Sequence, residues 1–401
     1  MSLTIKLKNI GILKQAEFSL GDLTLICGEN NTGKTYAACA LYGFLKSWHQ
    51  FIRVPINDAQ IQQAVTERVK IELEQATDDM LTEACKKYTE QLDKIFAVRE
   101  GSFQNSEFHL VTEDISSGAL PKPFICSTER TGVATFRKEL NFARGRLLKE
   151  MEQADPQIDL RELLSKAYQR YPSPIEANVD FIGQLQDIAK SKSFIAKEHP
   201  EILDDFTDIV GGTYAITQND LLYYIPKGMR LRLTMDQSSS AVRSLLDLNF
   251  YLHCAAEKGD LLMVDEPELS LHPENQRRIA RLFARLANLG VKVFVTTHSD
   301  YIIKELNTLI MLNHDKPYLK RVAEENGYQD SELISANQVK VYMTKEKLMP
   351  LEKGQKRRRR GYTLVPADID PEFGIEAGSF DKTIDAMNKI QRDIVWGAEQ
   401  D

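Results

Sequence analysis

The first 27 residues carry the spacing of apolar and polar side chains that is typical of short β-strands. Residues 3–8 alternate between apolar and polar side chains, as do residues 16–20. Residues 23–27 form an almost continuous apolar run after a Gly-Asp turn. A period of two places alternate side chains on one face of a strand, and a continuous run suits a strand that is buried on both faces. We therefore expect two or three short strands over residues 3–27.

The next part of the chain is mostly helical in pattern. Residues 56–99 and 134–210 carry apolar side chains at mostly helical spacing among many Glu, Gln and Lys residues. Two short strand patterns, at 108–111 and 123–126, lie between them. Clean heptads do not persist over several turns, which argues against a long coiled coil. We expect a mainly helical insertion with short strands over residues 51–212.

Strand and helix patterns alternate again in the second half of the chain. A serine-rich turn precedes a largely apolar helix, and Ser239 or Ser240 is suited to cap that helix. Four consecutive apolar residues at 261–264 favour a buried parallel strand. The expected strands lie at 213–216, 221–225, 229–234, 261–264, 291–297 and 339–343, and the expected helices at 241–252, 273–288, 301–311 and 380–396.

These patterns divide the chain into four parts. We expect a first α/β lobe at residues 1–50, the helical insertion at 51–212, a second α/β lobe at 213–315 and a C-terminal region at 316–401. Strands that alternate with helices predict an α/β fold in which a mixed sheet is flanked by helices. The helical insertion then separates the two lobes.

Composition narrows the class of protein. Of 401 residues, 42% are hydrophobic and 27% charged, which is ordinary for a globular protein with more than one core. The net charge of −7, from 51 basic and 58 acidic residues, argues against indiscriminate nucleic-acid binding but not against a local basic site. Five cysteines without CxxC spacing predict free thiols in a reducing compartment. Without a signal-peptide pattern or a long apolar run, we expect a cytoplasmic protein with no membrane span.

The stretch Gly28–Thr35 follows the apolar run at 23–27 and precedes a helix of small residues. Glycines at two positions of this loop permit backbone angles that a Cβ atom would forbid, so its N–H groups can surround a phosphate. The N-terminal end of the following helix adds a partial positive charge. Lys34 can reach the β- and γ-phosphates of a nucleotide, and the Thr35 hydroxyl can bind Mg²⁺. We therefore predict a nucleotide phosphate site rather than a simple glycine turn.

Two further strand ends carry groups that suit the same chemistry. Asp265 and Glu266 follow the apolar run at 261–264, and His298 follows the expected strand at 291–297. Asp265 is placed to hold Mg²⁺ directly or through water. Glu266 is placed to orient or deprotonate the attacking water, and His298 to contact the γ-phosphate. Each residue alone is also explained as a polar neighbour of a strand, but the three in this order favour a catalytic site.

These motifs resemble those of the ABC-type ATPases of the SMC, RecF and OLD-like group. Gly28–Thr35 matches their Walker A motif, and Leu261–Glu266 matches Walker B with its catalytic glutamate. The Asp-Glu-Pro-Glu…Leu-His-Pro sequence at 265–273 is similar to the corresponding stretch of the standalone RecF- and OLD-like members. Thr-Thr-His-Ser at 296–299 matches their switch-histidine motif.

The resemblance covers about residues 1–50 and 215–312, and it implies an ABC-type P-loop ATPase head with a helical insertion between two lobes. It also implies ATP as the nucleotide, Mg²⁺ as the metal, and hydrolysis by two heads that enclose the nucleotide between them. The implied catalytic residues are Lys34, Glu266 and His298, the metal ligands are Thr35 and Asp265, and the ATP-binding residues are Gly28, Glu29, Asn30, Asn31, Thr32, Gly33, Lys34, Thr35, Ser239 and Ser240.

Two parts of the family pattern are altered or missing. Ser238–Ala241 stands where the signature motif has a serine or two followed by glycine, and it lacks that glycine. We interpret it as the signature rather than a plain helix cap because it precedes the Walker B motif. The glutamine loop has no match. The stretch Ile125–Gly132 resembles a loop of defence-associated members, in which Arg130 either approaches a phosphate or belongs to a solvated salt-bridge loop.

The C-terminal region contains a basic run with four adjacent arginines: Lys356, Arg357, Arg358, Arg359 and Arg360. It has three interpretations, namely a solvated loop between strands, a surface for nucleic-acid phosphates, and a docking site for an acidic partner. No aromatic residue is interleaved with it, so base stacking is not indicated. Asp368 and Asp370 have the spacing of a metal-binding pair, but without a partner glutamate strand we interpret them as loop carboxylates.

The leading hypothesis is an ABC-type ATPase that forms homodimers or higher oligomers with ATP and Mg²⁺ between the heads. The short C-terminal region leaves little room for the nuclease domain of OLD-like proteins, so a separate effector protein is expected. By family analogy we expect a sensor or motor subunit in bacterial anti-phage defence. The alternatives are a RecF-like DNA repair ATPase and an assembly scaffold that holds ATP with little turnover. The long insertion disfavours a transporter ATPase.

Overall fold

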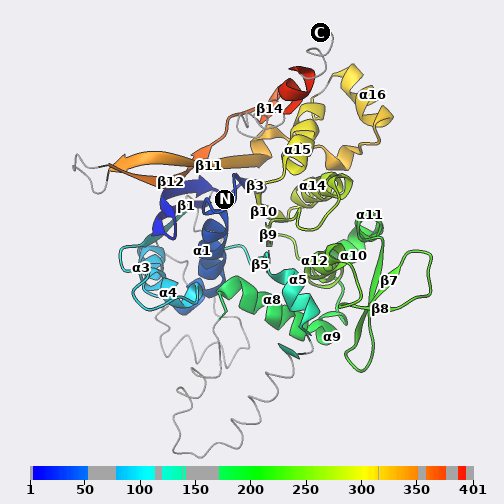
Figure 1. Ribbon diagram of the computed structural model, residues 1–401, viewed down its shortest axis with the longest axis horizontal. Coiled ribbons are helices and arrows are strands. Elements are labelled where there is room, and N and C mark those ends of the chain that lie inside the picture. The colour runs from blue at the N-terminus through cyan, green and yellow to red at the C-terminus, as the bar shows by residue number, and fades with distance from the viewer. Residues whose placement is uncertain are drawn as a thin grey trace, which may run out of the picture.

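A mixed β-sheet runs through the molecule and carries helices on both faces (Figure 1). The computed structural model describes residues 3–52, 78–112, 120–137, 139–140, 171–314, 316–350, 358–375 and 387–393.

Among the described residues, nine strands form this central sheet in the order β4-β1-β2-β12-β11-β3-β10-β9-β5. The expected α/β fold with a mixed sheet and flanking helices is confirmed. The strands are β1 (Leu3–Ile10), β2 (Leu13–Ser19), β3 (Leu23–Cys27), β4 (Glu107–Thr112), β5 (Pro123–Cys126), β9 (Leu261–Asp265), β10 (Lys292–Thr297), β11 (Val339–Pro350) and β12 (Arg358–Pro366).

Five neighbouring strands of the sheet run parallel and bring their carboxyl ends to one edge. β3 lies between β10 and β11, and β9 lies between β10 and β5, all in parallel pairing. β1 pairs antiparallel with both β2 and β4, which form the other wing of the sheet. The predicted buried parallel strand at 261–264 is therefore confirmed as β9, whose five residues are all buried.

The helices cover the two faces of this sheet. α1 (Lys34–Ser47), α3 (Asp78–Thr89) and α4 (Leu92–Ile95) share one apolar core with β1 and β2. α14 (Pro273–Asn288) and α15 (Asp300–Leu312) share the other core, on the opposite side of the sheet (Figure 1). Alternate residues of β3 supply both cores: Leu25 belongs to the α14 side and Ile26 to the α1 side.

The middle of the chain is mostly helical where it is described. Of the helical patterns expected at 56–99 and 134–210, residues 56–77, 138 and 141–170 lie outside the described residues. The remaining elements are η1 (Trp48–Gln50), α5 (Arg130–Thr135), α8 (Ser173–Gly183), α9 (Leu185–Ile188), α10 (Phe194–Glu198), α11 (Pro200–Val210), α12 (Ser240–Ser244), α13 (Leu246–Phe250), η2 (Tyr251–Ala255), α16 (Pro317–Glu325), η3 (Asp330–Glu332), η4 (Ala336–Gln338), and the short strands β6 (Gly212–Ile216), β7 (Leu222–Pro226), β8 (Leu233–Thr234), β13 (Ile369–Asp370) and β14 (Gly374–Ile375).

Two expected strands have different lengths in the structure. The strand expected at 229–234 is reduced to Leu233–Thr234, because the residues before it extend into solvent, with Met229 61% exposed. The strand expected at 339–343 continues to Pro350, because β12 pairs with it over its whole outer half. Arg358–Arg360 therefore lie in a strand and not in a loop.

β11 and β12, the two long strands of the C-terminal region, lie inside the central sheet rather than at its edge. β11 pairs with β3, and β12 pairs with β2, so both are inserted between the first strands of the chain. Of the helix expected at 380–396, only residues 387–393 are described, and they are helical. Within the part of the chain that the structure describes, no helix combines the length and the apolar character needed to cross a membrane.

One carboxyl group is buried in the core beneath the strand ends. Asp247 of α13 is 1% exposed, and neither of its carboxylate oxygens has a hydrogen-bond partner among the described residues. Burial raises the pKa of Asp247 from 3.8 to about 7, and the positive charge of Arg130 opposes this shift. The folded protein therefore favours the protonated form of this group.

We expect the free energy of unfolding to decrease as the pH rises from about 4 to about 7. In this range the unfolded chain has already released the proton that folded Asp247 keeps, so the folded state binds more protons. The loss amounts to at most about 1.4 kcal/mol per pH unit for one group. Urea unfolding at several pH values measures it. Asp247→Asn should flatten the slope, and parallel curves for the variant and the wild type would contradict the assignment.

Candidate functional site

The loop between β3 and α1 has the backbone that its glycines were predicted to provide. Gly33 has a φ of 102°, and Asn31 also has a positive φ, of 60°. A Cβ atom at Gly33 would lie 2.6 Å from Leu13 Cγ, which is closer than packed carbon atoms approach. α1 begins at Lys34 with no side-chain cap and no acidic residue in its first turn. The first N–H groups of this 14-residue helix are therefore available to an anion.

The Lys34 side chain folds back over this loop. Its ammonium group donates hydrogen bonds to the carbonyl oxygens of Gly28, at 2.9 Å, and Glu29, at 2.8 Å. Only 5% of Lys34 is exposed. Burial lowers the pKa of Lys34, and the carboxylates of Glu266 and Asp265 oppose this shift. A positive charge is thus held in the loop, close to the carboxylates that follow β9.

Asp265 lies next to Thr35, as the two proposed metal ligands require. The Thr35 hydroxyl donates to Asp265 Oδ1 at 3.3 Å, and the Thr296 hydroxyl of β10 donates to the same oxygen. Burial raises the pKa of Asp265 to about 6, although both hydroxyl hydrogen bonds lower it. A carboxylate and a hydroxyl oxygen at this separation are the kind of ligands that Mg²⁺ takes.

Glu266 and His298 approach each other above the ends of β9 and β10. His298 Nδ1 lies 3.5 Å from Glu266 Oε1. Glu266 has a φ of 51°, an uncommon backbone conformation for a residue with a side chain, and its N–H donates to the Thr296 carbonyl at 3.0 Å. The Glu266 side chain is 22% exposed and that of His298 41% exposed, so both groups can reach a bound molecule.

Glu268 is a site residue that the sequence reasoning did not single out. Its Oε1 atom accepts hydrogen bonds from the Thr297 hydroxyl at 2.8 Å and from the His298 N–H at 2.7 Å. The same oxygen lies 3.2 Å from His298 Nδ1. Glu268 therefore fixes both the backbone and the ring of His298. The second glutamate of the Asp-Glu-Pro-Glu sequence is the signal that could have identified it.

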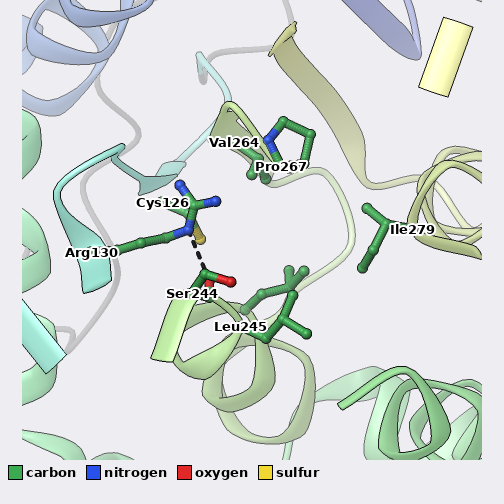
Figure 2. Close-up of a pocket in the computed structure, with 8 residues that line it drawn as sticks. Cys126, Arg130, Ser244, Leu245, Val264, Pro267 and Ile279 are labelled. Carbon is green, nitrogen blue, oxygen red and sulfur yellow. Dashed lines mark hydrogen bonds between the residues drawn. The ribbon is translucent and has the colours of Figure 1, made fainter. Parts of the chain in front are cut away.

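Arg130 lies in the interior, and Figure 2 shows its hydrogen bond to Ser244. It is 1% exposed and begins helix α5. Its guanidinium donates to the carbonyl oxygens of Ser244 at 2.8 Å, Asp265 at 2.7 Å and Glu266 at 2.8 Å, and also to that of Ser127. Arg130 thus connects helix α12 to the turn that carries the two carboxylates.

Both interpretations that the sequence offered for Arg130 need correction. It does not belong to a solvated salt-bridge loop, because it is buried and its partners are carbonyl groups. Four hydrogen bonds to carbonyl groups leave at most one of its five guanidinium N–H groups for a phosphate. β5 ends beside β9, so the polar residues 127–130 that follow β5, including Arg130, lie at the same edge of the sheet.

Thr344 joins the C-terminal part of the chain to the phosphate loop. It follows the β11 residue that pairs with Cys27, and its hydroxyl donates to Thr32 Oγ1 at 2.8 Å. A Cβ atom at Gly28 would collide with this hydroxyl group. The sequence carried no local signal for this contact, because Thr344 lies more than three hundred residues from the loop.

The serines of the predicted signature occupy the start of α12. Ser239 is the N-cap of this helix, and its hydroxyl accepts from the Val242 N–H at 3.3 Å. Ser239 and Ser240 are exposed, whereas Ser238 is buried. Among the described residues no hydrogen bond joins these serines to the phosphate loop of the same chain. Their contact with a nucleotide stays a prediction.

The other C-terminal candidates lie apart from this site. Arg357 is outside the described residues, and Arg359 and Arg360 are exposed on β12. Asp370 Oδ1 accepts hydrogen bonds from the N–H groups of Glu372 and Phe373 at 2.7 Å and 3.0 Å, which stabilises a turn. Asp370 was expected in a loop, but it is the last residue of the short strand β13.

The residues at the carboxyl edge fit a nucleotide phosphate with a divalent cation. The loop is shaped by glycines that cannot carry a Cβ atom, and the N-terminus of α1 lacks a side-chain cap. Lys34 supplies a cation, while Thr35 and Asp265 supply adjacent oxygen ligands. Glu266 and His298 lie at the next strand ends. Predicted residues from three separate parts of the sequence therefore meet at one edge.

Two parts of the chain match known families. Residues 1–171 match a family described as an AAA ATPase domain. Residues 127–304 match a family described as an AAA domain and assigned to the AbiEii toxin of a type IV toxin–antitoxin system. No curated protein matches the chain.

Solved structures of SMC head domains are also similar at low identity. An SMC head bound to the C-terminal winged-helix domain of ScpA is 13% identical, with a TM-score of 0.40, and the match covers 92% of this chain and 97% of that one. A Pyrococcus furiosus SMC head with an extended coiled coil, bound to the C-terminal domain of ScpA, is 13% identical with a TM-score of 0.36, over 98% and 100% of the chains. The SMC head of Thermotoga maritima is 11% identical with a TM-score of 0.31, over 92% and 100%.

The two family matches together extend over residues 1–304, which include the phosphate loop and all the strand ends described above. Both descriptions are of AAA-type ATPase domains, so over residues 1–304 the chain is similar to AAA-type ATPases.

Proposed function

We propose that this protein binds ATP with Mg²⁺ and hydrolyses it to ADP and phosphate. The observation that carries the proposal is the meeting of Lys34, Thr35, Asp265, Glu266 and His298 at one edge of the sheet. ATP binding itself is expected of the family. Hydrolysis is the further step, and it depends on Glu266 as the catalytic base.

Each residue has a role that its position supports. Lys34 and the N–H groups of α1 hold the phosphates, and Lys34 exchanges its two carbonyl partners for phosphate oxygens. Thr35 and Asp265 hold Mg²⁺, which neutralises phosphate charge when it is bound. Glu266 orients and deprotonates the attacking water. His298, held by Glu268, contacts the γ-phosphate end of the nucleotide.

We further propose that two copies of the chain enclose the nucleotides between them. This part rests on the family analogy and on the exposed Ser239 and Ser240 at the start of α12. Among the described residues, no hydrogen bond joins these two serines to the phosphate loop. In a head-to-head dimer these serines complete the site of the partner copy. ATP binding then favours the dimer and hydrolysis releases it.

The biological role that we propose is a cytoplasmic sensor or motor that acts on a separate effector in bacterial anti-phage defence. The match to an AAA domain assigned to the AbiEii toxin supports a role in this area or in a toxin–antitoxin system. A RecF-like DNA repair ATPase and an ATP-held scaffold are the alternatives. Nucleic acid is a further proposed partner through the arginine run at 357–360, and DNA-stimulated turnover favours the repair alternative.

Glu266→Gln should abolish turnover while leaving ATP binding intact. The amide cannot accept a proton from water, so we expect steady-state ATP hydrolysis to fall by a factor of about 100 or more. A fluorescent ATP analogue should bind with a similar Kd, and native mass measurements should show an ATP-dependent dimer that persists. Glu257→Gln, an exposed glutamate whose side chain is 69% accessible, is the matched control and should hydrolyse ATP normally.

Either of two results would contradict this assignment. Equal turnover by the wild type and Glu266→Gln would remove Glu266 from the mechanism. A wild-type protein that binds ATP but shows no turnover, with or without DNA, would favour the scaffold instead of the enzyme.

Arg130→Met should lower both stability and turnover. The variant leaves four buried carbonyl groups without their cationic donor, and we expect the free energy of unfolding to fall by about 3 kcal/mol or more. Turnover per folded molecule should fall as well, because the Glu266 carbonyl loses its partner. Urea unfolding and ATP hydrolysis below the unfolding transition are the two measurements.

Arg137→Met is the matched control for this prediction. Arg137 is also buried, and its guanidinium donates to the carbonyl groups of Ile182 and Asp220, away from the candidate site. We expect it to lose stability but to keep its turnover per folded molecule. A similar loss of turnover in both variants would mean that Arg130 acts only through general stability.

A further inference from the structure

The outer halves of β11 and β12 form a two-stranded ribbon that projects beyond the central sheet. β11 pairs with β3 only as far as Met343, and from there its partner is β12 alone. β12 pairs with β2 only at Tyr362 and Thr363. Figure 1 shows the ribbon extending away from the body of the molecule. We define the ribbon as residues 344–350 and 358–363.

The pairing register sorts the charged side chains of the ribbon onto its two faces. Lys345 pairs with Thr363, Lys347 with Gly361 and Met349 with Arg359. Paired residues of an antiparallel ladder share a face, and alternate residues along a strand share a face as well. Lys345, Lys347 and Arg359 therefore lie on one face, which we call the basic face, and all three are exposed.

The opposite face has a different character. Leu348 pairs with Arg360, and Glu346 pairs with Tyr362. Arg360 lies 3.8 Å from the carboxylate of Glu346, so its charge is partly compensated, and Leu348 is 60% exposed. Only part of the arginine run that stands out in the sequence therefore contributes to the basic face.

A fourth cation reaches the basic face from β2. A Cβ atom at Gly361 would lie 2.3 Å from Lys14 Cγ. Because Gly361 has no side chain, the aliphatic part of Lys14 can pack over the ribbon at this position. The described residues of this face, together with Lys14 and Gln15, include no carboxylate. The nearest acidic residue on the same side of β2 is Glu17, which pairs with Lys6 at 3.2 Å. Among the described residues, no ion pair involves Lys14, Lys345, Lys347 or Arg359.

The ribbon begins at the phosphate loop. Thr344, its first residue, donates to Thr32 Oγ1 of the loop at 2.8 Å. Thr344 also follows directly on the buried part of β11, in which Val341 and Met343 lie in the core. A molecule held on the basic face is therefore attached to the same strand that borders the candidate nucleotide site.

We propose that the basic face of the ribbon binds the phosphate backbone of double-stranded DNA. Four unpaired cations along one face of a narrow ribbon complement a regular line of phosphates. A two-stranded ribbon also fits the major groove of B-form DNA, whereas the major groove of an RNA duplex is too narrow for side chains to enter. The protein carries a net charge of −7, so this face is a local exception and not part of a general basic surface.

The test is direct DNA binding, measured without ATP so that it does not depend on hydrolysis. Fluorescence anisotropy of a labelled DNA duplex is recorded over a range of salt concentrations for the full chain. The triple variant Lys345→Glu, Lys347→Glu, Arg359→Glu should bind at least about tenfold more weakly. Its plot of log K against log salt should be less steep by about 2 to 3, because each phosphate contact contributes about 0.9 to the slope.

A matched triple variant controls for net charge. Lys86→Glu, Lys94→Glu and Lys192→Glu alter three exposed lysines on other elements by the same total charge. This control should bind DNA within about twofold of the wild type, since it leaves the ribbon unchanged. Circular dichroism of both variants checks that they remain folded.

Several outcomes would overturn the proposal. Failure of the wild type to bind DNA at low salt, or equal losses in the two triple variants, would exclude the basic face as a specific surface. Tighter binding to an RNA duplex would exclude DNA as the partner. Binding of polyglutamate but not of DNA, lost in the ribbon variant, would assign the face to an acidic protein instead. None of these results bears on ATP hydrolysis by Glu266, which is measured separately.

Discussion

The candidate site depends on the register of one block of parallel strands. The pairing of β3 with β10 and β11 places Cys27 level with Thr297 and Met343, and the pairing of β10 with β9 places Thr296 beside Asp265. Side chains alternate between the two faces of a sheet, so a shift of one residue would turn each apolar set toward the wrong core. It would also displace the following turn by about 3.3 Å. Packing of the two cores thus fixes the distances between the turns.

Charged groups are buried at this edge, and hydrogen bonds to the backbone compensate for their burial. Lys34 and Arg130 donate to carbonyl oxygens, and Oε1 of Glu268 accepts from an N–H group and a hydroxyl, whereas Oε2 of Glu268 has no hydrogen-bond partner among the described residues. A buried charge without such partners costs several kcal/mol, so these hydrogen bonds are a condition of the fold. They also restrain Glu266, whose positive φ costs about 1–3 kcal/mol and is held between Thr296 and Arg130.

The parts of the site that could be predicted are those with a local pattern. Lys34 ends the glycine-containing loop that follows the apolar strand β3, and Asp265 is the last residue of the apolar strand β9, so the local sequence pattern locates both residues. Arg130, Glu268 and Thr344 could not be located in this way, because their partners lie on other elements. The order of the sheet was equally inaccessible. Nothing in the sequence near β11 and β12 indicates that they insert between β2 and β3, since strand order depends on which apolar faces meet in three dimensions.

β11 combines two environments that the sequence treats as one stretch. Its first five residues pair with β3 and supply the core, and its outer residues are exposed and pair only with β12. The change occurs at Thr344, where the strand passes the phosphate loop. The hydrogen bond from Thr344 to Thr32 thus joins the base of the ribbon to the phosphate loop, at the point where β11 leaves the core.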